Sequence, residues 1–166
     1  ADVLIIGLCK YYQKSGSFVD VLNPTLISKC QDMEALMKNN IFVASACDKV
    51  IRRSLIEKNS LRFVEGQLSE DIEWCTMLLR DNLIIDCVQK SQYVYRQQNA
   101  NSISSNISRK NLEDILDVLV RYSQDDDNPY VKHFMANQLV LWLTNSFYIK
   151  KSRIKDLLLT AQKLNF

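Results

Sequence analysis

The spacing of hydrophobic and polar positions divides this chain into two parts that meet near residue 106. In the first part, short apolar runs are separated by polar turns, a pattern typical of strands mixed with short helices. Residues 3–12, rich in Val, Leu, Ile and Tyr, predict a strand. Lys14-Ser15-Gly16 predicts a turn, and the partial alternation of residues 17–22 predicts a second strand.

Caps, helical spacing and apolar runs predict the remaining elements of the first part. Asn23-Pro24 predicts a helix start, because Asn caps helices and Pro fits the first helical position, and apolar residues follow at helical spacing as far as Met37. The other expected elements are an extended stretch at 41–46, a short helix at 53–59, an extended stretch at 61–64, a helix at 69–82, strands at 83–88 and 93–97, and a polar loop at 99–106.

The second part is patterned for helices alone. Ser108 predicts the cap of an amphipathic helix, and Asn128-Pro129 predicts the start of a strongly apolar helix that runs to about Phe147. An acidic linker is expected at 124–128, and a last helix ends near Leu164. The fold class is therefore mixed α/β (α+β), with a mixed portion at 1–106 and a C-terminal helical subdomain at 107–166.

Composition narrows the class of protein. The 166 residues are 47% apolar and 24% charged, which is normal for one soluble globular domain or part of a larger one. The net charge is +2 with both signs interspersed, which excludes the clustered basic surface of a nucleic-acid-binding protein. Five cysteines without a Cys-x-x-Cys pair, beside a single histidine, exclude a Cys/His zinc site and predict reduced core cysteines in a cytoplasmic protein.

Two further features bear on localisation. The longest apolar run, Leu139 to Leu143, is far too short to span a bilayer. The chain opens in a strand-like run with neither Met nor the basic start of a signal peptide, so we expect a piece of a longer cytoplasmic protein, whether natural or truncated for expression.

The strongest candidate for chemistry is the acidic turn Ser69-Glu70-Asp71, at the start of a predicted helix after a glycine turn. Two interpretations compete. Acids in the first turn complement the helix dipole by about 0.3–1 kcal/mol, which is a purely structural role. A carboxylate on rigid backbone at the mouth of a fold is also well placed to act as a general base.

Several motifs accompany the acidic turn in a fixed order, and together they resemble those of bacterial family-2 glycosyltransferases that build surface polysaccharides. The resemblance covers about residues 1–105. In chain order, the motifs are Cys47-Asp48-Lys49-Val50-Ile51-Arg52-Arg53-Ser54-Leu55, Phe63-Val64-Glu65-Gly66, Glu70-Asp71-Ile72-Glu73-Trp74, Tyr93-Val94-Tyr95-Arg96 and Ser102-Ile103.

The resemblance implies the GT-A fold, in which a nucleotide-sugar half with an Asp-x-Asp metal site precedes an acceptor half. Asp2–Ile6 resembles the strand after Asp-x-Asp, so the chain is expected to be the acceptor-side portion, lacking the donor half and inactive by itself. The full-length enzyme would transfer a sugar, with inversion, from a nucleotide-sugar donor to a saccharide or lipid-linked acceptor. It would use Mg²⁺ or Mn²⁺, whereas this portion would hold no cofactor.

Residue roles follow from the same resemblance. Asp71 is expected to be the catalytic base, with Glu70 orienting either the acceptor or Asp71. Trp74 is expected to bind the acceptor, and the alternative is a core aromatic on a helix. Asp48 and Lys49 are expected either to line the acceptor cleft or to form a surface pair at a strand end, the favoured alternative. Arg96 would meet the donor diphosphate, and its alternative is a solvated strand end.

Two positions qualify the resemblance. The family often has Trp where this chain has Cys47, and a Cys cannot stack on a sugar, so acceptor binding does not carry over to this position. Asp125-Asp126-Asp127 matches Asp-x-Asp by letters, but it follows a helix rather than a strand and precedes a helix cap. We therefore interpret it as an acidic linker and assign no metal ligands.

Partners outside the reaction are also suggested. Lys150, Lys151, Arg153 and Lys155 form a basic cluster at the last helix, which fits either peripheral contact with anionic lipid at the inner face of the membrane or a solvated helix start, the favoured interpretation. A surface exposed by truncation would favour a homodimer. The alternative to an enzyme is a non-catalytic protein-interaction domain, in which the acidic turn is only a helix start.

Overall fold

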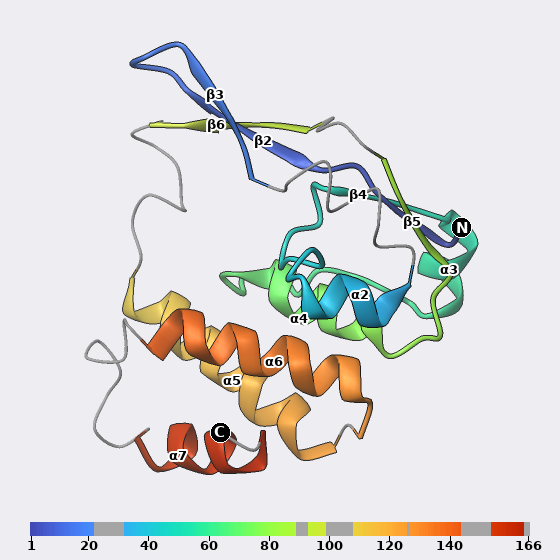
Figure 1. The fold of residues 1–166 in the computed structure, drawn as a ribbon. Coiled ribbons are helices and arrows are strands. Elements are labelled where there is room, and N and C mark those ends of the chain that lie inside the picture. Colours follow the sequence, from blue (N-terminus) through green and yellow to red (C-terminus); the bar gives the residue numbers. More distant parts are fainter. Residues whose placement is uncertain (22–31, 89–92, 99–107, 126, 144–153, 165–166) are drawn as a thin grey trace. The chain divides into compact units, whose positions relative to one another are not determined.

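The structure is a computed structural model that describes residues 1–21, 32–88, 93–98, 108–125, 127–143 and 154–164. Over these residues the fold is mixed α/β, of the α+β kind, with six helices and two three-stranded sheets (Figure 1). The chain forms two compact units. The sheet unit comprises Ala1–Leu61 and Asn82–Asn106, and the helical unit comprises Arg62–Asp81 and Ile107–Phe166.

The first sheet of the sheet unit has β1 (Val3–Ile5) at its centre. β1 pairs antiparallel with β4 (Lys49–Ile51) and parallel with β5 (Ile85–Cys87). Val3 and Ile5 are fully buried, as expected for alternate positions of a central strand. α3 (Arg53–Lys58) follows β4 directly.

The second sheet has β2 (Leu8–Tyr12) at its centre. β2 pairs antiparallel with β3 (Ser17–Asp20) and parallel with β6 (Tyr93–Gln97). The predicted turn connects β2 and β3, where Gly16 adopts φ +66°, a conformation that glycine tolerates without strain. All four residues of β3 are exposed at the edge of the sheet.

The strand predicted for residues 3–12 is wrong in one respect, because it is two strands. Ile6 and Gly7 separate β1 from β2, and Gly7 adopts φ +68°. A left-handed residue interrupts the extended ladder, so β1 and β2 enter different sheets. The apolar periodicity of the run continued across this break and therefore concealed it.

The loop segments of the sheet unit depart from prediction in places. The predicted helix start at Asn23-Pro24 lies outside the described residues. Its C-terminal part is present as α2 (Met33–Lys38), where the carboxylate of Asp32 accepts a hydrogen bond from the Ala35 amide at 2.7 Å. The stretch 41–46 forms no strand, although Ile41 and Phe42 are buried.

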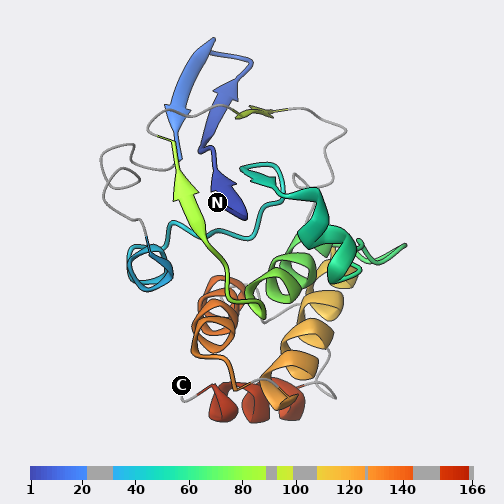
Figure 2. The same ribbon diagram turned by 90° about the vertical axis from the view of Figure 1, so that its right-hand side faces the viewer.

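Four helices make up the described core of the helical unit: α4 (Glu70–Leu79), α5 (Arg109–Asp125), α6 (Pro129–Leu143) and α7 (Ile154–Lys163). α5 packs against each of the other three (Figure 2). The buried side chains of α5 and α6 repeat at helical spacing, which explains why periodicity predicted both helices. The buried apolar side chains are Leu112, Ile115, Leu116, Val118, Leu119, Val131, Phe134, Met135 and Leu139.

Both predicted caps in this unit are confirmed. The Ser108 hydroxyl accepts from the Asn111 amide at 3.3 Å, and the Asn111 side chain accepts from the Ser108 amide at 2.9 Å, a reciprocal capping arrangement. The Asn128 side chain accepts from the Tyr130 amide at 2.9 Å and donates to the carbonyl of Leu79 at 3.1 Å. The second bond ties the start of α6 to the end of α4.

The boundary predicted at 106/107 coincides with one junction between the units. The segment 62–81, however, belongs with the C-terminal helices rather than with the rest of the first 106 residues. The acidic turn therefore stands on the helical unit. Among the described residues, no helix is both long enough and apolar enough to cross a membrane.

Candidate functional site

The acidic turn begins α4 after a strained residue. Ser69 precedes the helix at φ 58° and ψ 37°, a left-handed conformation that is uncommon outside glycine, and its side chain makes no capping hydrogen bond. Glu70 and Asp71 occupy the first turn and are half-buried. Non-glycine residues in such conformations persist only when the surrounding structure holds them there, and they gather at functional sites.

The loop before the acidic turn is fixed to α5 by a charged hydrogen bond. The amide of Leu68 donates to the carboxylate of Asp114 at 2.8 Å, and Lys110 donates to the same oxygen at 2.5 Å. Bonds between amides and carboxylates are stronger than neutral ones. The two acids are therefore held by an anchor two residues before Glu70 and by the rigid helix after it.

Glu73, the third acid of the motif, is buried and tied to α5. It is 3% exposed, and its Oε1 accepts hydrogen bonds from the guanidinium of Arg121 and from the hydroxyl of Tyr122, the latter at 3.1 Å. Burial, together with the Glu73 carboxylate, raises the pKa of Tyr122. The sequence assigned no role to Glu73. Its partners Arg121 and Tyr122 lie far along the chain, at separations of 48 and 49 positions, and no local pattern connects them to it.

Trp74 fits the core-aromatic alternative rather than an open sugar platform. It is 6% exposed, and the ring of Phe63 stacks on it with centroids 5.3 Å apart and planes at 19°. Phe63 is itself 51% exposed. The exposed aromatic surface of this pair is therefore that of Phe63, which belongs to the preceding sequence motif and was assigned no contact.

Asp48 and Lys49 form a buried ion pair, so both sequence-based interpretations of them need correction. Both side chains are fully buried, and their charged atoms lie 2.7 Å apart. The Lys49 ammonium also donates to the carbonyls of Val43 at 2.9 Å and Ser45 at 2.7 Å, and it lies 4.5 Å from the ring centroid of Phe42. Groups enclosed in this way neither line an open cleft nor form a surface pair.

The Asp48 carboxylate is only partly satisfied. Its Oδ2 is buried without a hydrogen-bond partner, whereas Oδ1 accepts from Lys49. Burial raises the pKa of Asp48, and the neighbouring ammonium opposes that shift. The pair pins the loop 43–48 to the start of β4, which is a structural role.

Arg96 is exposed on β6, where it lies opposite Tyr11 of β2. It belongs to the sheet unit, as do Asp48 and Lys49, whereas Glu70, Asp71 and Trp74 belong to the helical unit. Neither unit by itself brings Arg96 and Asp71 together. The loop predicted at 99–106, which follows Arg96, lies outside the described residues.

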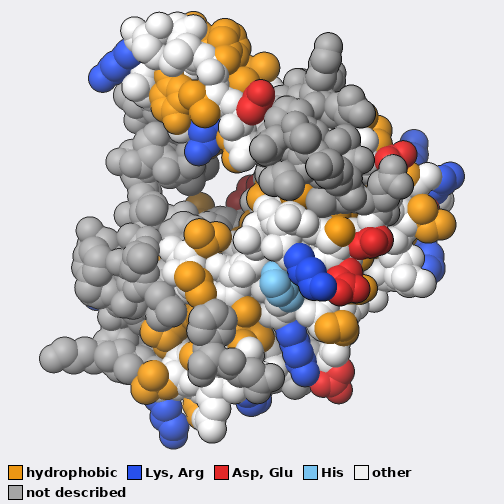
Figure 3. All heavy atoms as spheres, viewed as in Figure 1, with side chains coloured by type: hydrophobic (Ala, Val, Ile, Leu, Met, Phe, Trp, Pro, Cys, Tyr) orange, Lys and Arg blue, Asp and Glu red, His pale blue; other side chains and the backbone are white. Residues whose placement is uncertain are grey.

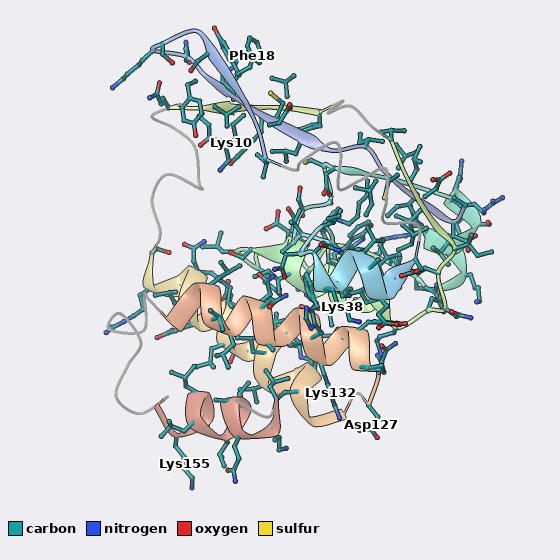
Figure 4. The ribbon with its side chains drawn as sticks, in the orientation of Figure 1. Lys10, Phe18, Lys38, Asp127, Lys132 and Lys155 are labelled. Atoms are coloured by element: carbon teal, nitrogen blue, oxygen red, sulfur yellow. The ribbon has the colours of Figure 1, made fainter. Side chains whose placement is uncertain are left out.

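Neither the acidic linker nor the cysteines offers a metal site in the part of the chain that the structure describes. No group of three or more His, Cys, Asp or Glu side chains there is arranged to hold a metal ion. α5 extends to Asp125, and Asp127 pairs with Lys132 at 3.0 Å (Figure 4). Cys9 and Cys75 are buried thiols as expected, but Cys47 is exposed, which corrects its placement in the core.

Comparisons with protein-family models, curated proteins and solved structures give no match to this chain. Functional inference therefore depends on the order of its motifs and on the geometry of the acidic turn.

Proposed function

We propose that this chain carries the acceptor side of an inverting family-2 glycosyltransferase, with Asp71 as the general base. The observation that carries the proposal is the acidic turn itself, in which two adjacent half-buried carboxylates begin α4. A left-handed Ser69 and the Leu68–Asp114 hydrogen bond fix the approach to that turn. The order of the motifs around the turn supports the same proposal.

The proposed transfer requires a correctly positioned general base from this chain. In an inverting transfer, a carboxylate removes the proton of the acceptor hydroxyl as its oxygen attacks the anomeric carbon. A half-buried carboxylate can reach a hydroxyl and still be partly shielded from water. The positive end of α4 favours anionic side chains at this position, and Glu70 is adjacent to orient the acceptor or Asp71.

Side chains of α5 support the helix that holds the proposed base. Glu73 lies one turn after Glu70 and is bonded to Arg121 and Tyr122, while Asp114 holds the loop before the helix. These contacts restrain α4 from both ends of its first turn. Precise orientation of a base requires such supporting contacts.

The reaction also requires stabilisation of the leaving diphosphate, and here the chain contributes less. The described residues do not fit a Mg²⁺ or Mn²⁺ site, since they offer no cluster of three carboxylate, histidine or cysteine ligands. Arg96, exposed on β6, has the guanidinium geometry to bind a diphosphate bidentately.

The test is release of nucleoside diphosphate by the product of the full open reading frame that encodes this chain. A panel of nucleotide sugars is assayed with saccharide and lipid-linked acceptors, and wild type is compared with Asp71→Asn. We expect release to fall by about 100-fold or more in the variant. Asp156→Asn is the matched control, because Asp156 is also a half-buried acid in the first turn of a helix, α7.

Equal release by wild type and Asp71→Asn would remove the assigned role from Asp71. If Asp71→Asn and Asp156→Asn lowered diphosphate release equally, the acidic turn would have only a role in helix stability.

A non-catalytic interaction domain is the second candidate function, and the edge strand β3 favours it. Phe18 is 62% exposed and Val19 is 49% exposed, on a strand whose outer backbone edge pairs with no described strand (Figure 4). Exposed apolar edge strands recruit further strands. Self-association or partner capture that Phe18→Lys abolishes, in a protein that releases no diphosphate, would favour this alternative.

A further inference from the structure

The outer face of α7 combines apolar and basic side chains. Its inner face is anchored by Thr160, 2% exposed, and by Leu164, 8% exposed at the residue after the helix. On the opposite face, Leu158 is 64% exposed and Leu159 is 46% exposed. Two leucines are thus held at the surface by a helix whose other side is packed against α5.

Lysines flank these leucines along the helix. Lys155 and Lys163 are exposed, and they lie one helical turn before and after Leu159. Lys155 projects away from the other helices (Figure 4). Asp156, in the same first turn, is half-buried and therefore contributes less to this surface. An exposed apolar centre between cations is the pattern of helices that lie in the plane of a membrane interface.

The same unit exposes further apolar side chains on α6. Val140 is 45% exposed and Leu141 is 63% exposed, near the C-terminal end of that helix. Figure 1 places the C-terminal end of α6 and the N-terminal end of α7 at the same end of the helical unit. In the space-filling view, hydrophobic side chains lie interspersed among polar ones on this face of the helical unit (Figure 3).

We propose that the outer face of α7 binds the surface of an anionic phospholipid bilayer. Leu158 and Leu159 would enter the interface, while Lys155 and Lys163 would contact lipid phosphates by extending their stems. With ten residues, α7 would lie along the surface.

The charge of this face selects the occupant. A second copy of the chain would bring Lys155 and Lys163 against the same lysines, which repel at close range. An uncharged bilayer would accept the leucines but give the lysines no counter-charge. An anionic bilayer satisfies both kinds of side chain. This inference is independent of the proposed glycosyltransferase activity, because it uses neither Asp71 nor any other residue of the acidic turn.

Co-sedimentation with lipid vesicles tests the proposal. The chain is mixed with vesicles of phosphatidylcholine alone and with vesicles that also contain phosphatidylglycerol. We expect binding to the anionic vesicles that weakens as salt is raised, because salt screens the lysine–phosphate attraction, and little binding to the neutral vesicles. Leu158→Gln is expected to weaken anionic-vesicle binding by roughly ten-fold and Lys155→Glu by roughly five-fold or more.

Two matched controls isolate the face from general effects. Ile84→Gln removes an apolar side chain that is 68% exposed on the sheet unit, and Lys14→Glu makes the same charge change at another exposed lysine. Both controls should bind as wild type does. Circular dichroism confirms that each variant retains its helices, and light scattering measures the mass of the unbound protein.

Three outcomes would overturn the proposal: absence of binding to anionic vesicles, equal losses in the controls and the α7 variants, and equal binding to neutral vesicles. Concentration-dependent dimerisation that Leu158→Gln abolishes, without vesicle binding, would assign the face to a second copy instead.

Discussion

Each unit of this protein contains a buried carboxylate that is paired with a cation, and the two cations differ in their exposure to solvent. Asp48 pairs with Lys49, and both side chains are fully enclosed. Glu73 pairs with Arg121, whose side chain is 56% exposed, so only the acid is removed from water. Each carboxylate keeps one oxygen without a hydrogen-bond partner. The two pairs therefore differ in their cations. Lys49 is buried together with Asp48, whereas Arg121 is exposed to solvent beside the buried Glu73.

The exposure of the cation indicates the role of each pair. Enclosing two charges costs more than their attraction returns unless further hydrogen bonds are made, and Lys49 makes them to two loop carbonyls. That pair fixes the path of a loop. The Glu73 pair instead links α4 to α5 and leaves its cation at the surface, beside the helix that carries the acidic turn.

The largest expected effect comes from breaking the enclosed pair. Lys49→Met leaves the Asp48 carboxylate without its partner and two carbonyls without a donor, so the free energy of unfolding should fall by about 3–5 kcal/mol. Urea denaturation measures this change. The double variant Asp48→Asn/Lys49→Met should regain part of the loss, and a loss below about 1 kcal/mol would show that water reaches the pair in solution.

A smaller effect is expected in the helical unit. Arg121→Met leaves Glu73 bonded to Tyr122, and only one charge of the pair was buried, so we expect a loss of about 1–3 kcal/mol by the same denaturation measurement. Exposed Arg53→Met, which removes an i,i+4 surface pair with Glu57, is the control and should cost under about 0.5 kcal/mol. If Arg121→Met lowered the free energy of unfolding as much as Lys49→Met does, the two ion pairs would not differ in the way proposed.

The raised pKa of Asp48 makes the stability of the protein depend on pH. Burial raises the folded-state pKa of Asp48, so the unfolded chain, with an ordinary value of 3.8, releases this proton at lower pH than the folded protein does. The Asp48 contribution to stability is therefore present below 3.8 and is lost as pH rises through the folded-state pKa. Asp48→Asn should remove that loss, so its stability relative to wild type should rise as pH is raised.

Denaturation curves collected from acid to neutral pH test this expectation. Asp86→Asn, at an exposed position of β5, is measured in parallel as the control. A relative stability of Asp48→Asn that stayed flat across the range would contradict the raised pKa.

The smallest expected change in stability comes from relieving backbone strain at one serine in each unit. Ser69, before α4, and Ser60, after α3, both adopt left-handed conformations, with φ of 58° and 50°. Replacing either with Gly relieves the steric cost and should raise thermal stability by up to about 1 kcal/mol. If Ser69→Gly stabilises the protein and also lowers diphosphate release, the strain is tied to function, whereas Ser60→Gly should leave release unchanged.

Elements with local signals could be predicted from the amino-acid sequence. Helical periodicity and the caps at Ser108 and Asn128 predicted the C-terminal helices, and Tyr93–Gln97 was predicted with its bounds as a strand. The position of the acidic turn at a helix start also followed from its neighbours in the chain. Caps and periodicity depend on residues within one or two turns, so a single sequence contains them.

Tertiary structure alone decided the features that depend on distant residues. The strand predicted at residues 3–12 is two strands separated at Gly7, and β1 and β2 pair in different sheets. Adjacent Asp48 and Lys49 were enclosed by loop residues rather than left at a surface, and Trp74 was covered by Phe63. Glu73 found its partners on another helix. Burial and pairing arise from contacts between separate segments, and a pattern read over neighbouring residues does not show which segments will meet.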